Sequence, residues 1–284
     1  MRVDHLVRLI LVAPLLFVAS ACGQEQKEPS TRRTEFQVGE FKAFVIEPLW
    51  VPRSQLRRWV WYAPTLGKGL PGAAEKWMFE QFYRGGIAVA GVDVGESFGS
   101  PRGRQGFQQL YEELTNRQGY HPQPVLLARS RGGLMLYSWA VEHPRAVAGI
   151  AGIYPVCNLA SYPGVRRAAG AYGLTAEELQ EQLSKHNPID RLAPLAKAGV
   201  PILHIHGDMD TVVPLDANSA ELAKRYRTFG GPVELEIVAG QGHNMWEGWF
   251  RSQRLTDFII ARAQGKSFPL ASKSQSEPRA NDGK

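Results

Sequence analysis

The stretch that decides the fold of this chain reads Val125-Leu126-Leu127-Ala128-Arg129-Ser130-Arg131-Gly132-Gly133-Leu134. Residues 125–128 form a short, continuous apolar run, which is typical of a strand buried on both faces of a sheet. Helical spacing of apolar residues runs from 134 to 141, so the stretch predicts a strand, a tight turn and a helix. Such a turn exposes the hydroxyl of Ser130 above the end of the strand, where the N-terminus of the helix adds a favourable dipole.

Strand and helix patterns alternate on both sides of this turn. Apolar, β-prone runs predict strands at 36–46, 59–62, 86–93, 147–154, 201–206 and 233–238. Helical spacing predicts helices at 75–83, 107–114, 175–183, 217–226 and 249–262. This alternation predicts an α/β fold with a mostly parallel central sheet and helices on both faces. In such sheets, functional side chains gather at the carboxyl ends of the strands.

Two further polar motifs follow predicted strands. The first reads His206-Gly207-Asp208-Met209-Asp210-Thr211-Val212-Val213-Pro214, and the second reads Gly240-Gln241-Gly242-His243. Together with Ser130 they supply a hydroxyl nucleophile, a carboxylate and an imidazole. A histidine that takes the proton of a serine, and is itself oriented by a carboxylate, is the arrangement that nucleophilic catalysis by serine requires.

The three motifs resemble those of the α/β-hydrolase superfamily of serine hydrolases, and the resemblance covers about 58–264. The first is similar to the G-x-S-x-G nucleophile turn, with Ala128 in place of the first glycine. The second resembles the H-G-x-x-D-x-x-V-P stretch, whose register favours Asp210 over Asp208 as the acid. The resemblance implies an α/β-hydrolase fold with Ser130, Asp210 and His243 as the catalytic residues, in that chain order, and with no metal or cofactor.

The resemblance also implies two backbone donors for an oxyanion. The N–H of Arg131 is expected to be one, and the other comes from Thr65 or Leu66 after the strand at 59–62, with Thr65 preferred. Further candidates for contact with substrate are the side chains of Arg129, Glu96, Tyr154 and Trp246. An arginine beside the serine can bind a substrate carboxylate in a fork, or it can be an ordinary surface residue.

The N-terminus predicts a targeting segment over 1–21. Arg2 and Arg8 precede an apolar run at 9–19, and small residues then lead to Cys22. This pattern resembles the signal peptide of bacterial lipoproteins, which implies acylation of Cys22, export and anchoring to a membrane, with the outer membrane and periplasm as the expected location. The alternatives are cleavage after Ala21 without a lipid, or an apolar N-terminal helix.

The remaining organisation follows from composition. Residues 22–34 are polar and predict a flexible tether, and 265–284 predict a disordered tail. The hydrolase domain is therefore expected at 35–264, with a lid insertion at 158–195. The net charge is +6, but no run of five basic residues and no nucleic-acid-binding motif occurs, which argues against a nucleic-acid partner. The two cysteines predict neither a disulfide nor a zinc site.

The activity expected from these features is hydrolysis of carboxylic esters through an acyl-enzyme, with acylated carbohydrate outside the cytoplasm as the substrate class. One alternative is a serine peptidase that resembles prolyl oligopeptidase. That family shares the order of the three residues and the Ser-x-Gly-Gly turn, but it normally carries a large propeller domain. The other alternative is an inactive hydrolase fold that serves as a binding module.

Overall fold

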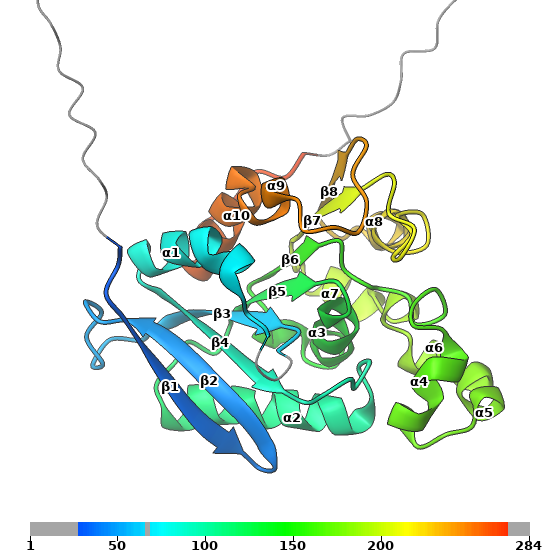
Figure 1. Ribbon diagram of the computed structural model, residues 1–284, viewed down its shortest axis with the longest axis horizontal. Coiled ribbons are helices and arrows are strands. Elements are labelled where there is room, and N and C mark those ends of the chain that lie inside the picture. The colour runs from blue at the N-terminus through cyan, green and yellow to red at the C-terminus, as the bar shows by residue number, and fades with distance from the viewer. Residues whose placement is uncertain (1–27, 66–68, 272–284) are drawn as a thin grey trace, which may run out of the picture.

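A computed structural model describes residues 28–65 and 69–271 of the chain. An eight-stranded sheet lies at its centre, in the order β1-β2-β4-β3-β5-β6-β7-β8 (Figure 1). The strands are β1 Thr31–Val38, β2 Phe41–Pro48, β3 Arg58–Ala63, β4 Ile87–Asp93, β5 Val125–Arg129, β6 Gly149–Ile153, β7 Ile202–Gly207 and β8 Val233–Val238. Among the strands that the structure describes, β1–β2 and β2–β4 pair antiparallel and the other five pairs are parallel, so the prediction of a mostly parallel sheet is confirmed.

Helices cover both faces of the sheet, as predicted. The helices are α1 Lys76–Arg84, α2 Pro101–Glu112, α3 Gly132–Ala140, α4 Val165–Tyr172, α5 Ala176–Glu181, α6 Leu183–His186, α7 Ala193–Lys197, α8 Ser219–Thr228, α9 Glu247–Phe250 and α10 Gln253–Ala263. One buried apolar cluster packs α2, α3, α7 and α8 against one face, and a second packs α1, α9 and α10 against the other. Side chains of β3 alternate between them, with Trp61 in the first cluster and Tyr62 in the second.

The N-terminal boundary differs from the prediction. Strand β1 begins at Thr31, inside the segment 22–34 that was expected to be a tether, and pairs with β2 along its whole length. The buried carboxylate of Glu47 on β2 binds Arg32 and Arg57. The polar residues of β1 hide this pairing because a strand at the edge of a sheet exposes most of its side chains.

The C-terminal boundary also differs. Residues 265–271, expected to begin a disordered tail, lie against the edge of the sheet next to β8. The ring of Phe268 packs on Phe258 of α10, with the centroids 5.6 Å apart. Arg254 donates to the carbonyl of Pro269 at 3.0 Å, and the N–H of Ala271 donates to Glu234 at 2.8 Å. The segment was predicted to be disordered because most of its residues are polar, but the side chain of Phe268 packs against the core.

The expected insertion between β6 and β7 is helical and carries α4, α5 and α6. It packs on the loop after β4 through Phe98, and on Leu134 and Val213. The predicted capping box of Thr175 and Glu178 is present, but the helix predicted at 175–183 breaks after Glu181. Within the described ranges, no helix combines the length and the apolar character needed to cross a bilayer. The predicted signal segment and Cys22 lie outside the described residues.

Candidate active site

The turn after β5 holds Ser130 in a strained conformation, with φ at 50° in the left-handed region. Two glycines make this turn possible. A Cβ atom on Gly132 would lie 2.1 Å from the carbonyl oxygen of Ala63, and one on Gly133 would lie 2.3 Å from that of Val156. The helix therefore starts in close contact with the ends of β3 and β6. This packing projects the serine at the carboxyl edge of the sheet, as the motif predicts.

Three side chains from three strand ends meet at this edge. Ser130 Oγ lies 2.9 Å from His243 Nε2, and His243 Nδ1 lies 2.8 Å from Asp210 Oδ2. The loops after β5, β7 and β8 carry them, and these strands lie close together in the sheet. Because Nδ1 donates to the carboxylate, Nε2 is left to accept the serine proton. The geometry is that of a nucleophile, a base and an orienting acid.

The side chain of Asp210 is completely buried, and hydrogen-bond donors around it stabilise its negative charge. The backbone N–H groups of Val212 and Val213 donate to Oδ1 at 3.0 and 2.8 Å. Burial raises the pKa of Asp210, but hydrogen bonds from His206 and His243 lower it well below its usual range. The alternative acid, Asp208, instead accepts a hydrogen bond from the N–H of Gly240 at 2.7 Å, which ties the two loops together.

The oxyanion donors expected from the sequence lie in suitable segments. Arg131 directly precedes α3, where N–H groups lack a carbonyl acceptor within the helix. Thr65 is buried and follows the Ala63–Pro64 segment that contacts Gly132, so it lies close to the nucleophile turn. Leu66, the other expected donor, lies outside the described residues. The roles of Arg131 and Thr65 stay predictions.

Arg129 does not present a free guanidinium to substrate, contrary to the expectation. Its Nη1 pairs with Glu75 Oε1, and the two side chains are only 13% and 2% exposed. Tyr62 donates to the same carboxylate oxygen at 2.7 Å, and the N–H of Gly72 donates to the other at 2.9 Å. Arg129 pairs with Glu75 because both side chains are buried, and a charged group inside a protein needs a partner of opposite charge.

The Arg129 side chain also supports the loop that carries His243. Its Nη2 lies 3.0 Å from the sulfur of Met245, and its guanidinium lies over the ring of Phe250. Sequence reasoning missed Glu75 and Tyr62. Tyr62 ends a predicted strand and Glu75 begins a predicted helix, but nothing in the local sequence links Glu75 to an arginine 54 residues away.

The other expected substrate contacts have different surroundings. The buried ring of Tyr154 packs on the His243 ring with centroids 4.4 Å apart, so it supports the base rather than offering a face to substrate. Arg131 forms an ion pair with Glu96, in which both side chains are partly exposed. Trp246 is 43% exposed and packs edge-on against Trp249. Trp246, Glu96 and the Arg131 side chain thus remain accessible.

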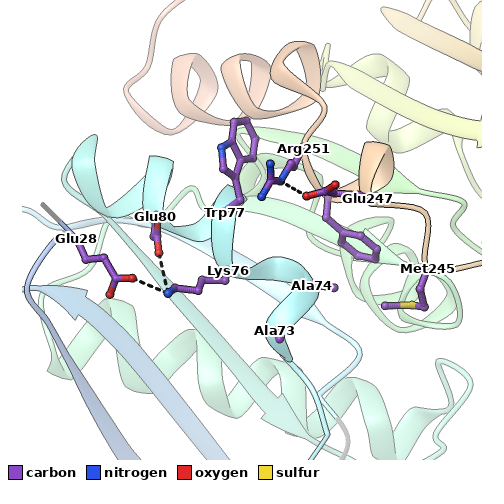
Figure 2. Close-up of a pocket in the computed structure, with 10 residues that line it drawn as sticks. Glu28, Ala73, Ala74, Lys76, Trp77, Glu80, Met245, Glu247 and Arg251 are labelled. Carbon is purple, nitrogen blue, oxygen red and sulfur yellow. Dashed lines mark hydrogen bonds and ion pairs between the residues drawn. The ribbon is translucent and has the colours of Figure 1, made fainter. Parts of the chain in front are cut away.

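A hollow of about 380 Å³ lies beside the histidine loop (Figure 2). Met245 and Glu247 line it from that loop and α9, and Ala73 and Ala74 line it from the opposite side, next to Glu75. Its charged groups are mutually paired: Figure 2 shows Lys76 with Glu28 and Glu80, and Arg251 with Glu247. Met245 and Phe250 both line the hollow, and both also contact the guanidinium of Arg129. The hollow therefore lies next to the Arg129–Glu75 pair.

The sequence profile of the prolyl oligopeptidase family matches residues 108–261. The matched segment runs from α2 to α10 and contains Ser130, Asp210 and His243. It is more than half of the chain. No curated protein matches the chain in a sequence search.

Solved structures with the same fold include peptidases and other hydrolases. A puromycin hydrolase is 19% identical, with a TM-score of 0.67 over 85% of this chain and 41% of its own. The acylaminoacyl peptidase of Pyrococcus horikoshii is 16% identical, with a TM-score of 0.65 over 89% of this chain and 43% of its own. The S-formylglutathione hydrolase of Agrobacterium tumefaciens is 13% identical, with a TM-score of 0.63 over 84% of this chain and 95% of its own.

These likenesses confirm the α/β-hydrolase fold. The chain spans only about two fifths of the length of the peptidases that it resembles. The expectation of a carboxylic ester hydrolase is wrong, because the matched family is one of peptidases and the similar structures include a dipeptidyl aminopeptidase of Bacteroides ovatus besides those above. Ester and peptide hydrolases share the same three residues, so the motifs could not separate them. The chain is a serine hydrolase that belongs to the prolyl oligopeptidase family.

Proposed function

We propose that this chain is a serine peptidase of the prolyl oligopeptidase type. Ser130 is the nucleophile, His243 the general base and Asp210 the acid that orients His243. The observation that carries the proposal is the continuous hydrogen-bond chain from Ser130 Oγ through both nitrogens of His243 to Asp210, within the segment that matches the family. The strained φ of Ser130 supports it, because such strain is concentrated at functional sites.

The reaction is acyl transfer from an amide to water. His243 takes the hydroxyl proton of Ser130, and Oγ bonds to the carbonyl carbon of the substrate. The N–H groups of Arg131 and Thr65 hold the oxyanion that forms. His243 then gives its proton to the departing amine as the C–N bond breaks. A water molecule, deprotonated by His243, then bonds to the acyl carbon, and His243 returns the proton to Ser130 Oγ as the acyl group leaves.

Substrate contacts come from the accessible side chains around this centre. We expect the peptide to lie near the accessible side chains of Arg131, Glu96 and Trp246, with the hollow beside Met245 available to one end of it. Peptide amides are therefore the substrate class, and amides that follow proline are the first to test, given the family.

A second proposal concerns location. The chain is exported and held on a membrane by acylated Cys22, which is supported by the charge, apolar run and small residues of 1–22 alone. Metabolic labelling of the full chain with an alkyne fatty acid tests it. Incorporation that is lost in Cys22→Ser supports the anchor, and absence of label in the wild-type chain refutes it.

The decisive test of the activity uses the full chain beside Ser130→Ala and His243→Ala. A fluorophosphonate probe is expected to label the wild-type chain and neither variant. Hydrolysis of aminoacyl-proline anilides is then expected for the wild type only. A well-folded wild-type chain that takes no label would refute the nucleophile, and a labelled chain that cleaves no peptide amide in a broad panel would refute the peptidase.

A further inference from the structure

A second set of hydrogen-bonding side chains lies behind Asp210, on the side away from Ser130. Tyr137 on α3, His204 and His206 on β7, and Ser219 at the start of α8 are each at most 1% exposed. Tyr137 Oη lies 2.7 Å from His204 Nε2, and Ser219 Oγ lies 3.0 Å from His204 Nδ1 and 2.8 Å from His206 Nδ1. The four side chains thus form one continuous series that ends beside Asp210.

The last member faces two acceptors. His206 Nε2 lies 2.9 Å from the carbonyl oxygen of Val213 and 3.4 Å from Asp210 Oδ2. Neither oxygen can donate a proton, because one belongs to a peptide carbonyl and the other to a carboxylate held ionised by its donors. His206 therefore carries a proton on Nε2 and shares it between the two oxygens.

With a neutral His206 ring, the proton on Nε2 leaves Nδ1 bare, and the other protons of the series follow from this. Burial, and then the neighbouring His206, lower the pKa of His204 to about 3, so that ring is neutral. If Ser219 donates to His206 Nδ1, its only proton is used, and it must accept from His204 Nδ1–H. His204 Nε2 is then bare and accepts the proton of Tyr137. All four groups are satisfied with one proton each, and no alternative direction satisfies them all.

The direction of the series matters for the carboxylate. Each donor points toward Asp210, so the dipoles add and polarise the final N–H of His206. The carboxylate of Asp210 thereby has His206 as a donor, in addition to His243 and the backbone N–H groups of Val212 and Val213. Burial raises the pKa of Tyr154, whose ring packs against His243, and the charge of Asp210 adds to this effect.

We propose that Tyr137, His204, Ser219 and His206 form a buried, one-directional relay that sets the orientation and effective charge of Asp210, with His206 as a positioning residue for the acid. The inference rests on the role proposed above for Asp210. Within the described residues, the hydrogen bonds of the four side chains lead to Asp210 and Val213 and not to Ser130, so we expect them to act through the carboxylate.

The kinetic test compares His206→Met with His206→Gln in the full chain. Methionine removes the donor to Asp210, whereas glutamine places an N–H near the position of Nε2, and both remove the imidazole acceptor of Ser219. The readout is the rate of labelling of Ser130 by a fluorophosphonate as a function of pH. This rate depends on the activated serine and not on the identity of the peptide substrate.

We expect His206→Met to lower the plateau rate about ten-fold, the factor for one hydrogen bond to a charged group. Its acid limb moves to higher pH, because a carboxylate with one donor fewer holds the protonated His243 more strongly. His206→Gln keeps the wild-type acid limb. Equal acid limbs in the two variants, with loss of thermal stability alone, would mean that His206 is merely structural and would overturn the proposal.

Controls and a direct measurement complete the test. Ser138→Ala, which removes a buried hydroxyl next to Tyr137 that has no partner within the described residues, is expected to leave the acid limb unchanged. Nitrogen-15 NMR of the wild-type chain should find the proton of the His206 ring on Nε2 and that of the His204 ring on Nδ1. The opposite tautomers refute the relay even if no variant folds, whereas failure of the wild type to label refutes the proposed function instead.

Discussion

Arg129 and Arg131 flank the same serine, two residues apart, but the fold gives them different tasks. The side chain of Arg129 points into the protein and binds the buried carboxylate of Glu75, whereas that of Arg131 points outward to Glu96. Loss of one partner of a buried ion pair leaves a charge without compensation, while an exposed pair contributes little. The comparison teaches that burial, and not residue type, determines what an arginine beside a nucleophile does.

The largest effect is expected from Arg129→Met, which leaves the carboxylate of Glu75 buried without its cation. The free energy of unfolding should fall by about 3–5 kcal/mol. Labelling of Ser130 should slow by about 10-fold or more, because Met245 and Phe250 lose the contact that supports the histidine loop. Urea unfolding and fluorophosphonate kinetics measure both quantities. A change below 1 kcal/mol would remove the distinction between the two arginines.

The double variant Arg129→Met with Glu75→Gln should recover about 2 kcal/mol relative to Arg129→Met alone. No charge remains buried in the double variant, and the glutamine carbonyl still accepts from Tyr62. A double-mutant cycle by urea unfolding gives the coupling energy. Additive losses would show that the arginine contributes through packing instead of charge.

Glu47 forms ion pairs whose burial is intermediate between those of Arg129 and Arg131. Its carboxylate is buried, and its partners include buried Arg57 and exposed Arg53. Burial raises its pKa, but hydrogen bonds from Arg32 and Arg57 outweigh this and lower it to about 2. Its contribution is present almost in full above pH 4.5 and is lost as pH falls toward 2, by roughly 3 kcal/mol. Glu47→Gln should flatten the pH dependence of unfolding in this window. An unchanged slope in the variant would contradict the assignment.

The smallest effect is expected from Arg131→Met. Its ion pair is partly exposed, so stability should change by less than about 1 kcal/mol. The backbone N–H at this position is retained, and labelling of Ser130 by a small fluorophosphonate should stay within about three-fold of the wild-type rate. Only peptide substrates with an acidic side chain near the scissile bond should be affected more. A general loss beyond ten-fold would place the guanidinium in the catalytic centre.

Local patterns predicted much of the fold and the centre of the site. Continuous apolar runs and helical spacing predicted the buried strands and the main helices, because both patterns depend on which face of each element meets the core. Boundaries failed where that pattern is weak: β1 is an exposed edge strand, and Phe268 anchors a segment of otherwise polar composition. The motifs also did not separate this family from esterases, because both use the same three residues.

The sequence by itself therefore determined the order Ser130, Asp210, His243 on the carboxyl ends of strands, since turn chemistry and periodicity act over only a few residues. The tertiary structure alone decided which of two arginines is buried, that Glu75 is its partner, and that Tyr137 and Ser219 continue a series of hydrogen bonds to Asp210. Those contacts join residues 13 to 67 positions apart, and they exist only once the sheet has brought its strand ends together.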